Sequence, residues 1–96
     1  MPEDGFEYTI SDTAEIKMNF SSALAFLKNG NKVAREGWNA NNQFVFLHEP
    51  PVPATLIDGK VCENFPYFQL KNAQDKLFPW VPSTGDLLAE DWVLVD

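Results

Sequence analysis

The stretch of sequence that decides the fold is MNFSSALAFLKNGNKVAREGW, residues 18–38. Its apolar residues Phe20, Leu24 and Leu27 recur at the three- and four-residue spacing that places side chains on one face of an α-helix. A helix with one such apolar stripe buries it against another layer of structure. The spacing therefore predicts an amphipathic helix over 19–29.

The flanking residues indicate where this helix begins and ends. Asn19 suits the N-cap, because its side chain can accept a hydrogen bond from a free backbone N–H of the first turn, and Gly30 suits the position after the last turn. The pattern then predicts a strand over 32–35 and a second over 43–47, joined by an Asn-rich turn into a hairpin. The second strand is apolar at successive positions, which predicts burial on both of its faces.

Prolines and polar turns punctuate the second half of the chain. Three prolines open a segment, 50–64, that is predicted as a loop because proline cannot donate to a β-ladder, with a turn at Asp58-Gly59. The whole pattern is typical of an α+β domain, in which one N-terminal amphipathic helix packs on a mostly antiparallel sheet of about five strands. The other predicted elements are strands at 66–71, 76–78 and 92–95, a turn and potential helix cap at 83–86 and one helical turn at 87–91.

The 96 residues carry a net charge of −7, which is unevenly spread. Residues 1–16 hold acidic side chains and no basic one. We therefore divide the chain into an acidic N-terminal extension, 1–17, which is either an edge strand or a partly ordered arm, and a single domain, 18–96. The acidic balance argues against binding a nucleic-acid polymer, which needs many Lys and Arg side chains. No apolar run has the length of a membrane span and no signal peptide is evident, so we expect a cytoplasmic protein.

Residue types that usually perform catalysis or bind metals are few and scattered. The single cysteine, Cys62, and the single histidine, His48, exclude an internal disulfide and the usual zinc clusters. His48 suits either a general base or a structural position at a strand end. Asp86 and the pair Glu90–Asp91 suit either a divalent cation or the acidic first turn of a short helix. We assign no catalytic or metal-binding residue and expect no cofactor.

Three tryptophans, Trp38, Trp80 and Trp92, each lie near polar residues in the sequence. Flat rings beside amide and hydroxyl groups suit a pocket for a heterocyclic base, with stacking worth about 1–3 kcal/mol per base. The same rings would equally suit the core of a small sheet. A modest basic cluster near the end of the helix, which includes Arg35, could meet a small anion or simply solvate the helix end.

Two separated motifs carry a resemblance to a known family. The first reads MNF, then AL and LK, then GNKVAREGWN, over residues 18–39. The second reads PYFQLK at 66–71, then PWVPS and DLLAEDW at 79–92. In this order the motifs resemble a small phage and prophage family, long described only as a domain of unknown function, that includes the Thoeris anti-defense sponges. The similarity spans roughly 18–95, apart from the middle loop.

The resemblance implies a non-enzymatic protein that binds a cyclic nucleotide signal and holds it without cleaving it. The signals implied are the cyclic ADP-ribose type made by bacterial TIR-domain enzymes and, in some members, cyclic dinucleotides. It also implies a homotetramer whose ligand pockets form where protomers meet, in the cytoplasm of a bacterial host. In this role the tryptophans would stack on bases, polar side chains would hydrogen-bond the ligand, and the guanidinium would meet phosphate. The residues implied are Trp38, Asn39, Arg35, Trp80, Ser83, Thr84 and Asp86.

Two other functions stay open from the sequence. The first is a protein–protein adaptor that uses the acidic extension 1–17 and an exposed aromatic patch to engage a basic partner. The second is a small hydrolase that acts on the same nucleotides through His48 or the Glu90–Asp91 pair.

Overall fold

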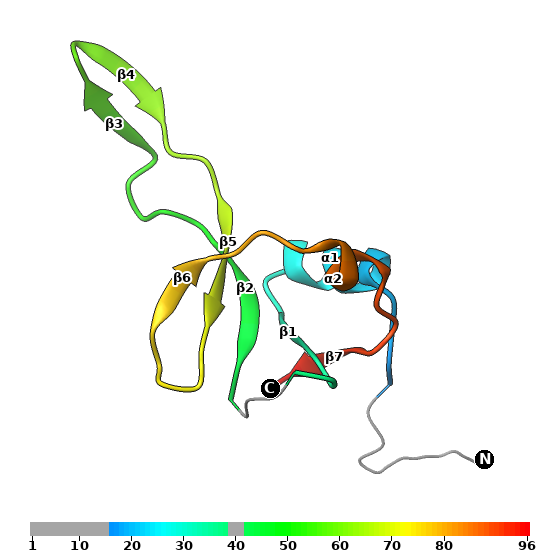
Figure 1. The fold of residues 1–96 in the computed structure, drawn as a ribbon. Helices are drawn as coiled ribbons and strands as arrows, with labels where there is room; N and C mark the ends of the chain where they lie inside the picture. Colours follow the sequence, from blue (N-terminus) through cyan, green and yellow to red (C-terminus); the bar gives the residue numbers. More distant parts are fainter. Residues whose placement is uncertain (1–15, 39–41) are drawn as a thin grey trace.

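The computed structural model describes residues 16–38 and 42–96 (Figure 1). Two helices, a five-stranded sheet and a separate two-stranded sheet make up this part of the chain. Most of the predicted extension 1–17 and the candidate Asn39 lie outside the described residues. Neither helix in the described part is long and apolar enough to cross a bilayer.

The first helix, α1 (Phe20–Lys28), confirms the prediction made from the apolar spacing. Asn19 is its N-cap and accepts a hydrogen bond on Oδ1 from the backbone N–H of Ser22 (3.0 Å). Gly30 follows with φ +92°, a left-handed conformation that glycine adopts without steric cost, and its N–H donates to the carbonyl of Leu27 (3.0 Å). The two caps set the bounds of the helix.

The main sheet has the strand order β6-β5-β2-β1-β7, and every neighbouring pair is antiparallel. This confirms the predicted α+β class and the hairpin between the first two strands, where Val33 pairs with Val45. The Met18 bridge to Trp92 continues the pairing on the outer side of β7. The strands are β1 (Lys32–Arg35), β2 (Phe44–His48), β5 (Tyr67–Lys71), β6 (Leu77–Pro79) and β7 (Trp92–Val95).

The core lies between α1 and one face of the main sheet. Its buried members are Phe20, Ala23, Leu27, Val33, Val45 and Trp92. Because side chains alternate along a strand, Phe44 and Phe46 point to the other face, which we call the open face. They are half-buried, so the prediction that this strand is buried on both faces is wrong: full burial is limited to Val45, whose side the helix covers.

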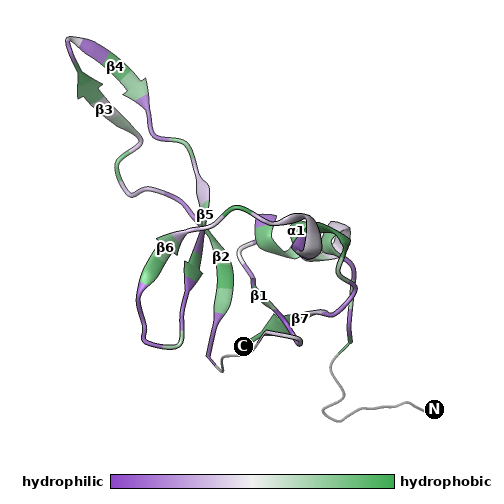
Figure 2. Ribbon diagram, viewed as in Figure 1, coloured by the Kyte–Doolittle hydropathy of each residue, from purple (hydrophilic) through white to green (hydrophobic). Residues whose placement is uncertain are grey.

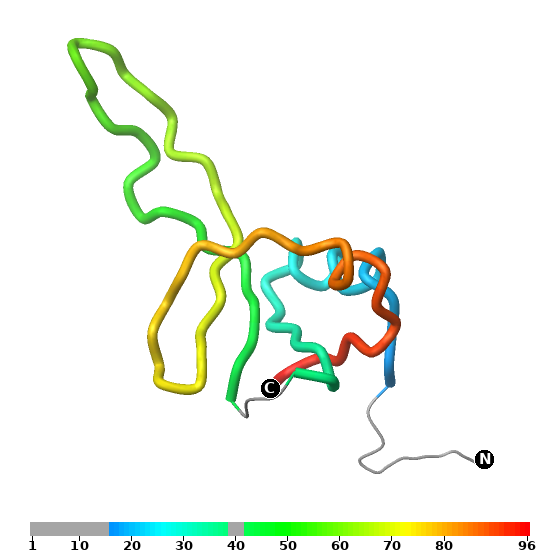
Figure 3. The backbone as a smooth tube through the Cα atoms, in the orientation of Figure 1, coloured from blue at the N-terminus to red at the C-terminus, as the bar shows by residue number. Residues whose placement is uncertain are grey.

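The prediction of a loop over 50–64 is wrong for most of that segment, which forms two strands, β3 (Ala54–Ile57) and β4 (Lys60–Glu63). The prolines all precede β3, so none removes a donor from this ladder. The predicted turn is confirmed: Asp58 (φ +50°) and Gly59 (φ +78°) form the two-residue connection. This hairpin leaves the sheet after β2 and returns into β5 (Figure 3).

The second helix, α2 (Thr84–Leu88), begins three residues before the helical turn predicted at 87–91. Ser83 is its N-cap, and its side chain accepts from the backbone N–H of Asp86 (3.1 Å) while Asp86 accepts from the backbone N–H of Ser83 (3.0 Å). This reciprocal capping box starts the helix at residue 84, inside the segment predicted as a turn.

Candidate functional site

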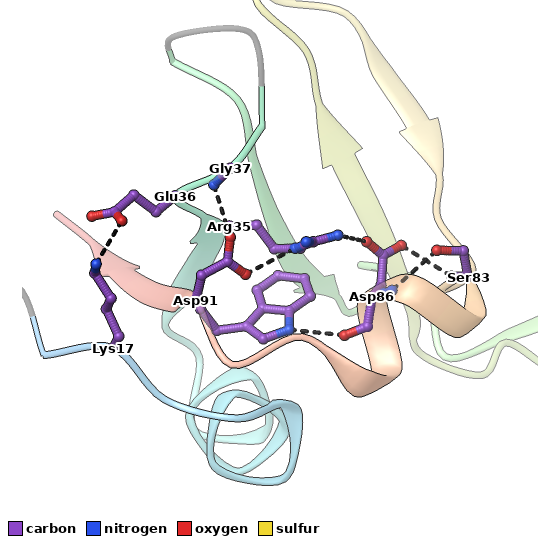
Figure 4. A network of polar contacts seen from close by, with 8 residues as sticks. Lys17, Arg35, Glu36, Gly37, Ser83, Asp86 and Asp91 are labelled. Atoms are coloured by element: carbon purple, nitrogen blue, oxygen red, sulfur yellow. Dashed lines mark hydrogen bonds and ion pairs between the residues drawn. The ribbon is translucent and has the colours of Figure 1, made fainter.

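A network of charged side chains joins β1 to α2 and to the segment before β7 (Figure 4). Arg35, the last residue of β1, donates from Nε to Oδ1 of Asp91 (3.0 Å) and from Nη1 to Oδ1 of Asp86 (3.1 Å). The other carboxylate oxygen of each aspartate accepts a backbone N–H, from Gly37 to Asp91 (2.8 Å) and from Ser83 to Asp86 (3.0 Å). One guanidinium therefore holds three segments of the chain together.

The surroundings of these two carboxyls favour their charged form. Burial acts to raise the pKa of Asp86, but hydrogen bonds from Ser83 and Arg35 outweigh it and hold that pKa below its ordinary value of 3.8. In Asp91, burial is likewise outweighed by the hydrogen bonds from Arg35 and from the Gly37 N–H, so its pKa is also lowered. The hydrogen bonds to Asp91 and Asp86 raise the pKa of Arg35. The network is therefore an ion-paired cluster at neutral pH.

We expect this cluster to lose its stabilising effect in acid. Because the pKa values of Asp86 and Asp91 are lower in the folded than in the unfolded chain, their contribution is complete above the ordinary carboxyl value of 3.8 and falls as the pH drops through it. Urea titrations at pH 6 and pH 3 measure this. The difference in unfolding free energy between the wild type and Arg35→Met should shrink toward pH 3, whereas a constant difference would show that the ion pairs contribute little.

The three tryptophans meet around Trp92, which is fully buried and belongs to the core. The rings of Trp38 and Trp80 each contact it edge-on, with centroids 5.5 Å and 6.0 Å away, and the Phe20 ring lies at 5.4 Å. The indole Nε1 of Trp92 donates to the carbonyl oxygen of Asp86 (3.0 Å). Trp38 and Trp80 themselves are half-buried. The prediction that the tryptophans fill the core therefore holds in full for Trp92. Trp38 and Trp80 pack against the core but are each partly exposed.

Most of the described residues that the resemblance implies lie in this one region. Trp80 packs edge-on against Phe68 (6.2 Å) on the helix-covered side of the sheet. Ser83 and Asp86 satisfy each other at the start of α2, while Thr84 is exposed there. Their contacts to a ligand stay a prediction. Sequence reasoning missed Asp91 as the partner of Arg35, since nothing in the local pattern indicates a pair separated by 56 residues.

On the open face, a cleft of about 400 Å³ lies beside Trp38. Ala34, Val93 and Val95 supply apolar lining from the two strands β1 and β7. The amides of Asn42 and Gln43 also line it. The cleft thus combines an indole ring, apolar lining and amide groups, which suits a small heterocyclic ligand.

Charged side chains of both signs line the same cleft, among them Arg35 and Lys71. The Lys71 ammonium donates to the carbonyl of Asn42 (2.6 Å), pairs with Asp75 (2.7 Å) and lies 5.4 Å from the centroid of the Phe44 ring. Lys71 and Phe44 were missed from the sequence. They are 27 positions apart and become neighbours only through the register of β2 with β5, where they pair directly.

Two acidic side chains complete the lining of the cleft. Asp96 lies at the end of the chain, and Glu36 pairs with Lys17 across 2.8 Å, with both of these side chains about half exposed. Because these carboxylates repel an anion, the cationic side chains of Arg35 and Lys71 mark the part of the lining that suits an anionic group.

The catalytic and metal-binding alternatives gain no support from the arrangement of their residues. His48 ends β2 with its ring edge-on to Tyr67 (5.3 Å), and Cys62 is exposed on β4. Asp86 belongs to the first turn of α2, as one of its two interpretations had it, whereas Glu90 and Asp91 follow the end of the helix, so for this pair the first-turn interpretation is wrong. No group of three or more His, Cys, Asp or Glu side chains within residues 16–38 and 42–96 is arranged to hold a metal ion.

Comparison with known proteins adds two findings. A family described as the Thoeris anti-defense 2-like domain matches residues 18–95. The chain is also similar to a protein of Bacillus phage SP01 named Thoeris anti-defense 2, with 42% identity over 85 residues. That alignment covers 82% of this chain and 96% of the phage protein.

Proposed function

Because the chain belongs to the Thoeris anti-defense 2-like family, we propose that it sequesters a cyclic nucleotide immune signal without chemically changing it. Membership supports a role in phage anti-defense. The mechanism is our inference, and its ligands are the cyclic ADP-ribose type of signal or a cyclic dinucleotide. Holding such a ligand requires stacking, hydrogen bonds and one or two cations, but no activated nucleophile.

The observation that carries this proposal is the cleft beside Trp38. Its volume of about 400 Å³ is within the usual range of small-molecule sites. An exposed part of the indole ring can stack on a base, and the Lys71 ammonium can attract a phosphate. Asn42 and Gln43 can hydrogen-bond the polar edges of the ligand.

The proposal narrows the residues that the resemblance implies. Both Trp38 and Trp80 pack against the core beside Trp92, but of the two only Trp38 also lines the cleft. Arg35 lines the cleft as well, but it is bound to two mostly buried carboxylates, so we give it the role of fixing the cleft wall. The carboxylate that pairs with Lys71 is 79% exposed and can give way to a phosphate. We therefore place the base on Trp38 and the phosphate near Lys71.

Assembly and location are part of the same proposal. A chain of this size leaves considerable apolar surface exposed, including Phe65 and Val81, and pairing with further copies would cover some of it. We propose a homo-oligomer, a tetramer by family resemblance, that acts in the cytoplasm of the bacterial host, where the nucleotide signal is made. Neither a nucleic-acid polymer nor a membrane is expected as a partner.

Calorimetric titration with cyclic ADP-ribose isomers and with cyclic dinucleotides tests the proposal. We expect at least one of them to bind with a micromolar Kd or tighter. Trp38→Ala should weaken that binding by about 10- to 100-fold, because a stacked base contributes about 1–3 kcal/mol. Absence of binding tighter than millimolar by the wild type across the whole set would contradict the proposal.

Trp80→Ala is the matched control for this titration. It removes the same side chain from a second half-buried position that also contacts Trp92, so its cost in stability should be similar. Since Trp80 does not contribute to the cleft lining, its removal should change the Kd by less than about threefold. An equal loss of affinity in both variants would contradict the placement of the base on Trp38 in the cleft.

A further inference from the structure

The open face of the sheet carries an apolar groove that α1, which packs on the opposite face, does not cover. Figure 2 shows hydrophobic residues on β2 and β6, the two strands that flank β5. The groove has a volume of about 420 Å³, and Phe44, Phe46 and Leu77 are among the residues that line it. Leu77 is 54% exposed. Exposed apolar surface of this kind, bordered by charged side chains, marks a contact site.

Two lysines line the same groove and give it a positive charge. The ammonium groups of Lys32 and Lys71 lie 5.0 Å and 5.4 Å from the centroid of the Phe44 ring. Lys71 also pairs with Asp75, but within residues 16–38 and 42–96 no carboxylate pairs with Lys32. The groove therefore suits an occupant that combines apolar side chains with negative charge.

The sequence of residues 1–15 combines these two properties. It contains no Lys or Arg, and its acidic side chains are Glu3, Asp4, Glu7, Asp12 and Glu15. Phe6, Tyr8 and Ile10 recur at every second position, the spacing that places side chains on one side of an extended chain. The segment precedes the residues 18–95 that the family matches, so membership of the family assigns it no role.

The chain enters the described domain beside the open face. Lys17 pairs with Glu36 (2.8 Å), and Glu36 lines the cleft. The cleft adjoins the groove, because Phe44 and Lys71 line both. The sheet is four strand spacings wide from β7 to Leu77 on β6, or about 19 Å. Fifteen residues can span up to about 50 Å, which is enough to cross the cleft and reach the groove.

We propose that residues 1–15 dock in the open-face groove of their own chain. Phe6 and Tyr8 would fill the apolar part of the groove, and the acidic side chains around them would approach Lys32 and Lys71. The contact does not rest on the proposed function, because it requires no ligand. It has one consequence for that function: the acidic segment and the phosphate of a nucleotide would compete for Lys71.

Disulfide trapping in the whole 96-residue chain tests the contact. Cys62→Ser removes the single native cysteine, and Tyr8→Cys is then combined with Leu77→Cys in the groove. The control combines Tyr8→Cys with Val81→Cys, at an 84% exposed residue outside the groove lining. Equilibration with a glutathione buffer gives the effective concentration of each cysteine pair. We expect it to be at least about tenfold higher for the pair with Leu77→Cys.

The position of Val81 makes this control stringent. Val81 follows Trp80, whose ring contacts that of Trp92, and Trp92 is the bridge partner of Met18. The cysteine at Val81 is therefore near the point where the segment joins the domain, whereas Leu77 is on the far edge strand of the sheet. A segment without affinity for the groove would meet the cysteine at Val81 at least as often. A preference for Leu77 thus requires attraction to the groove.

A charge reversal separates docking from general proximity. Lys32→Glu, in the groove, should lower the effective concentration of the Leu77 pair by about threefold or more. Lys28→Glu makes the same change at an exposed lysine outside the groove lining and should alter it by less than about twofold. Equal values for the Leu77 and Val81 pairs, or a preference for Leu77 that Lys32→Glu leaves unchanged, would overturn the proposal. Disulfides that join two chains would place the segment on a neighbouring copy and overturn it as well.

Discussion

Trp92→Ala is expected to lower the free energy of unfolding by about 3–5 kcal/mol, the range for deleting a large buried aromatic side chain. The Trp92 ring is fully buried. The rings of Phe20 in α1, Trp38 in the connection between β1 and β2, and Trp80 in the loop before α2 all contact it. Its loss also leaves the carbonyl of Asp86 without the indole donor. Because a domain of this kind has a total stability of about 5–15 kcal/mol, the variant is expected to populate its unfolded state measurably.

Urea unfolding followed by far-ultraviolet circular dichroism measures this effect without relying on tryptophan emission. Leu94→Ala is the control, because Leu94 lies in the same strand but is 45% exposed, and it should cost roughly 1 kcal/mol or less. If Trp92→Ala does not fold, Trp92→Phe keeps a ring and removes the indole donor, and should still cost about 1–3 kcal/mol. A cost below about 1 kcal/mol for Trp92→Ala would contradict its central place in the core.

Arg35→Met should cost about 2–4 kcal/mol of unfolding free energy at neutral pH. Methionine keeps most of the aliphatic stem, so the loss comes from the charge and the hydrogen bonds. The change leaves Asp86 and Asp91, whose side chains are 13% and 27% exposed, without their shared cation. Breaking a well-buried pair costs about 3–5 kcal/mol, and the partial exposure of these groups lowers the expected value.

Thermal unfolding provides the comparison for the Arg35 variant. Glu36→Gln removes the neighbouring ion pair to Lys17, whose partners are about half exposed, and should change the stability by less than about 1 kcal/mol. For a domain of this size, about 1 kcal/mol corresponds to about 4–8 °C in Tm. Equal shifts in Arg35→Met and Glu36→Gln would show that the network of Arg35 is no more than a surface ion pair.

Local sequence patterns predicted the elements whose determinants are close together in the chain. The helix follows from the spacing of its apolar residues and from the caps Asn19 and Gly30, which all lie within twelve residues. The first hairpin and the turn at Asp58 follow from residue type in the same way. The hairpin of β3 and β4 was missed because the three prolines at 50, 51 and 53 were taken to prevent strand pairing over the whole segment 50–64. Residues 54–64 contain no proline, so they are free to pair.

The candidate site depends on contacts that no local pattern contains. Asp91 and Lys71 take their places through pairings between residues far apart in the sequence, with Asp91 on Arg35, 56 positions away, and Lys71 beside Phe44, 27 positions away. The resemblance implied both Trp38 and Trp80 as site residues, and it could not tell that Trp38 lines the cleft whereas Trp80 only packs against the core. The alternation of side chains in β2 and β5 would have placed Lys71 on the open face once their register was known.

The most direct test of sequestration is a mass balance of the ligand. Protein in excess is incubated with the tightest-binding cyclic nucleotide, free ligand is measured by chromatography after ultrafiltration, and the protein is then heat-denatured and the ligand measured again. The account predicts that free ligand falls in proportion to the protein added and that the same quantity returns chemically unchanged after heating. Ligand that never leaves the filtrate, or that returns as a cleaved product, would contradict it.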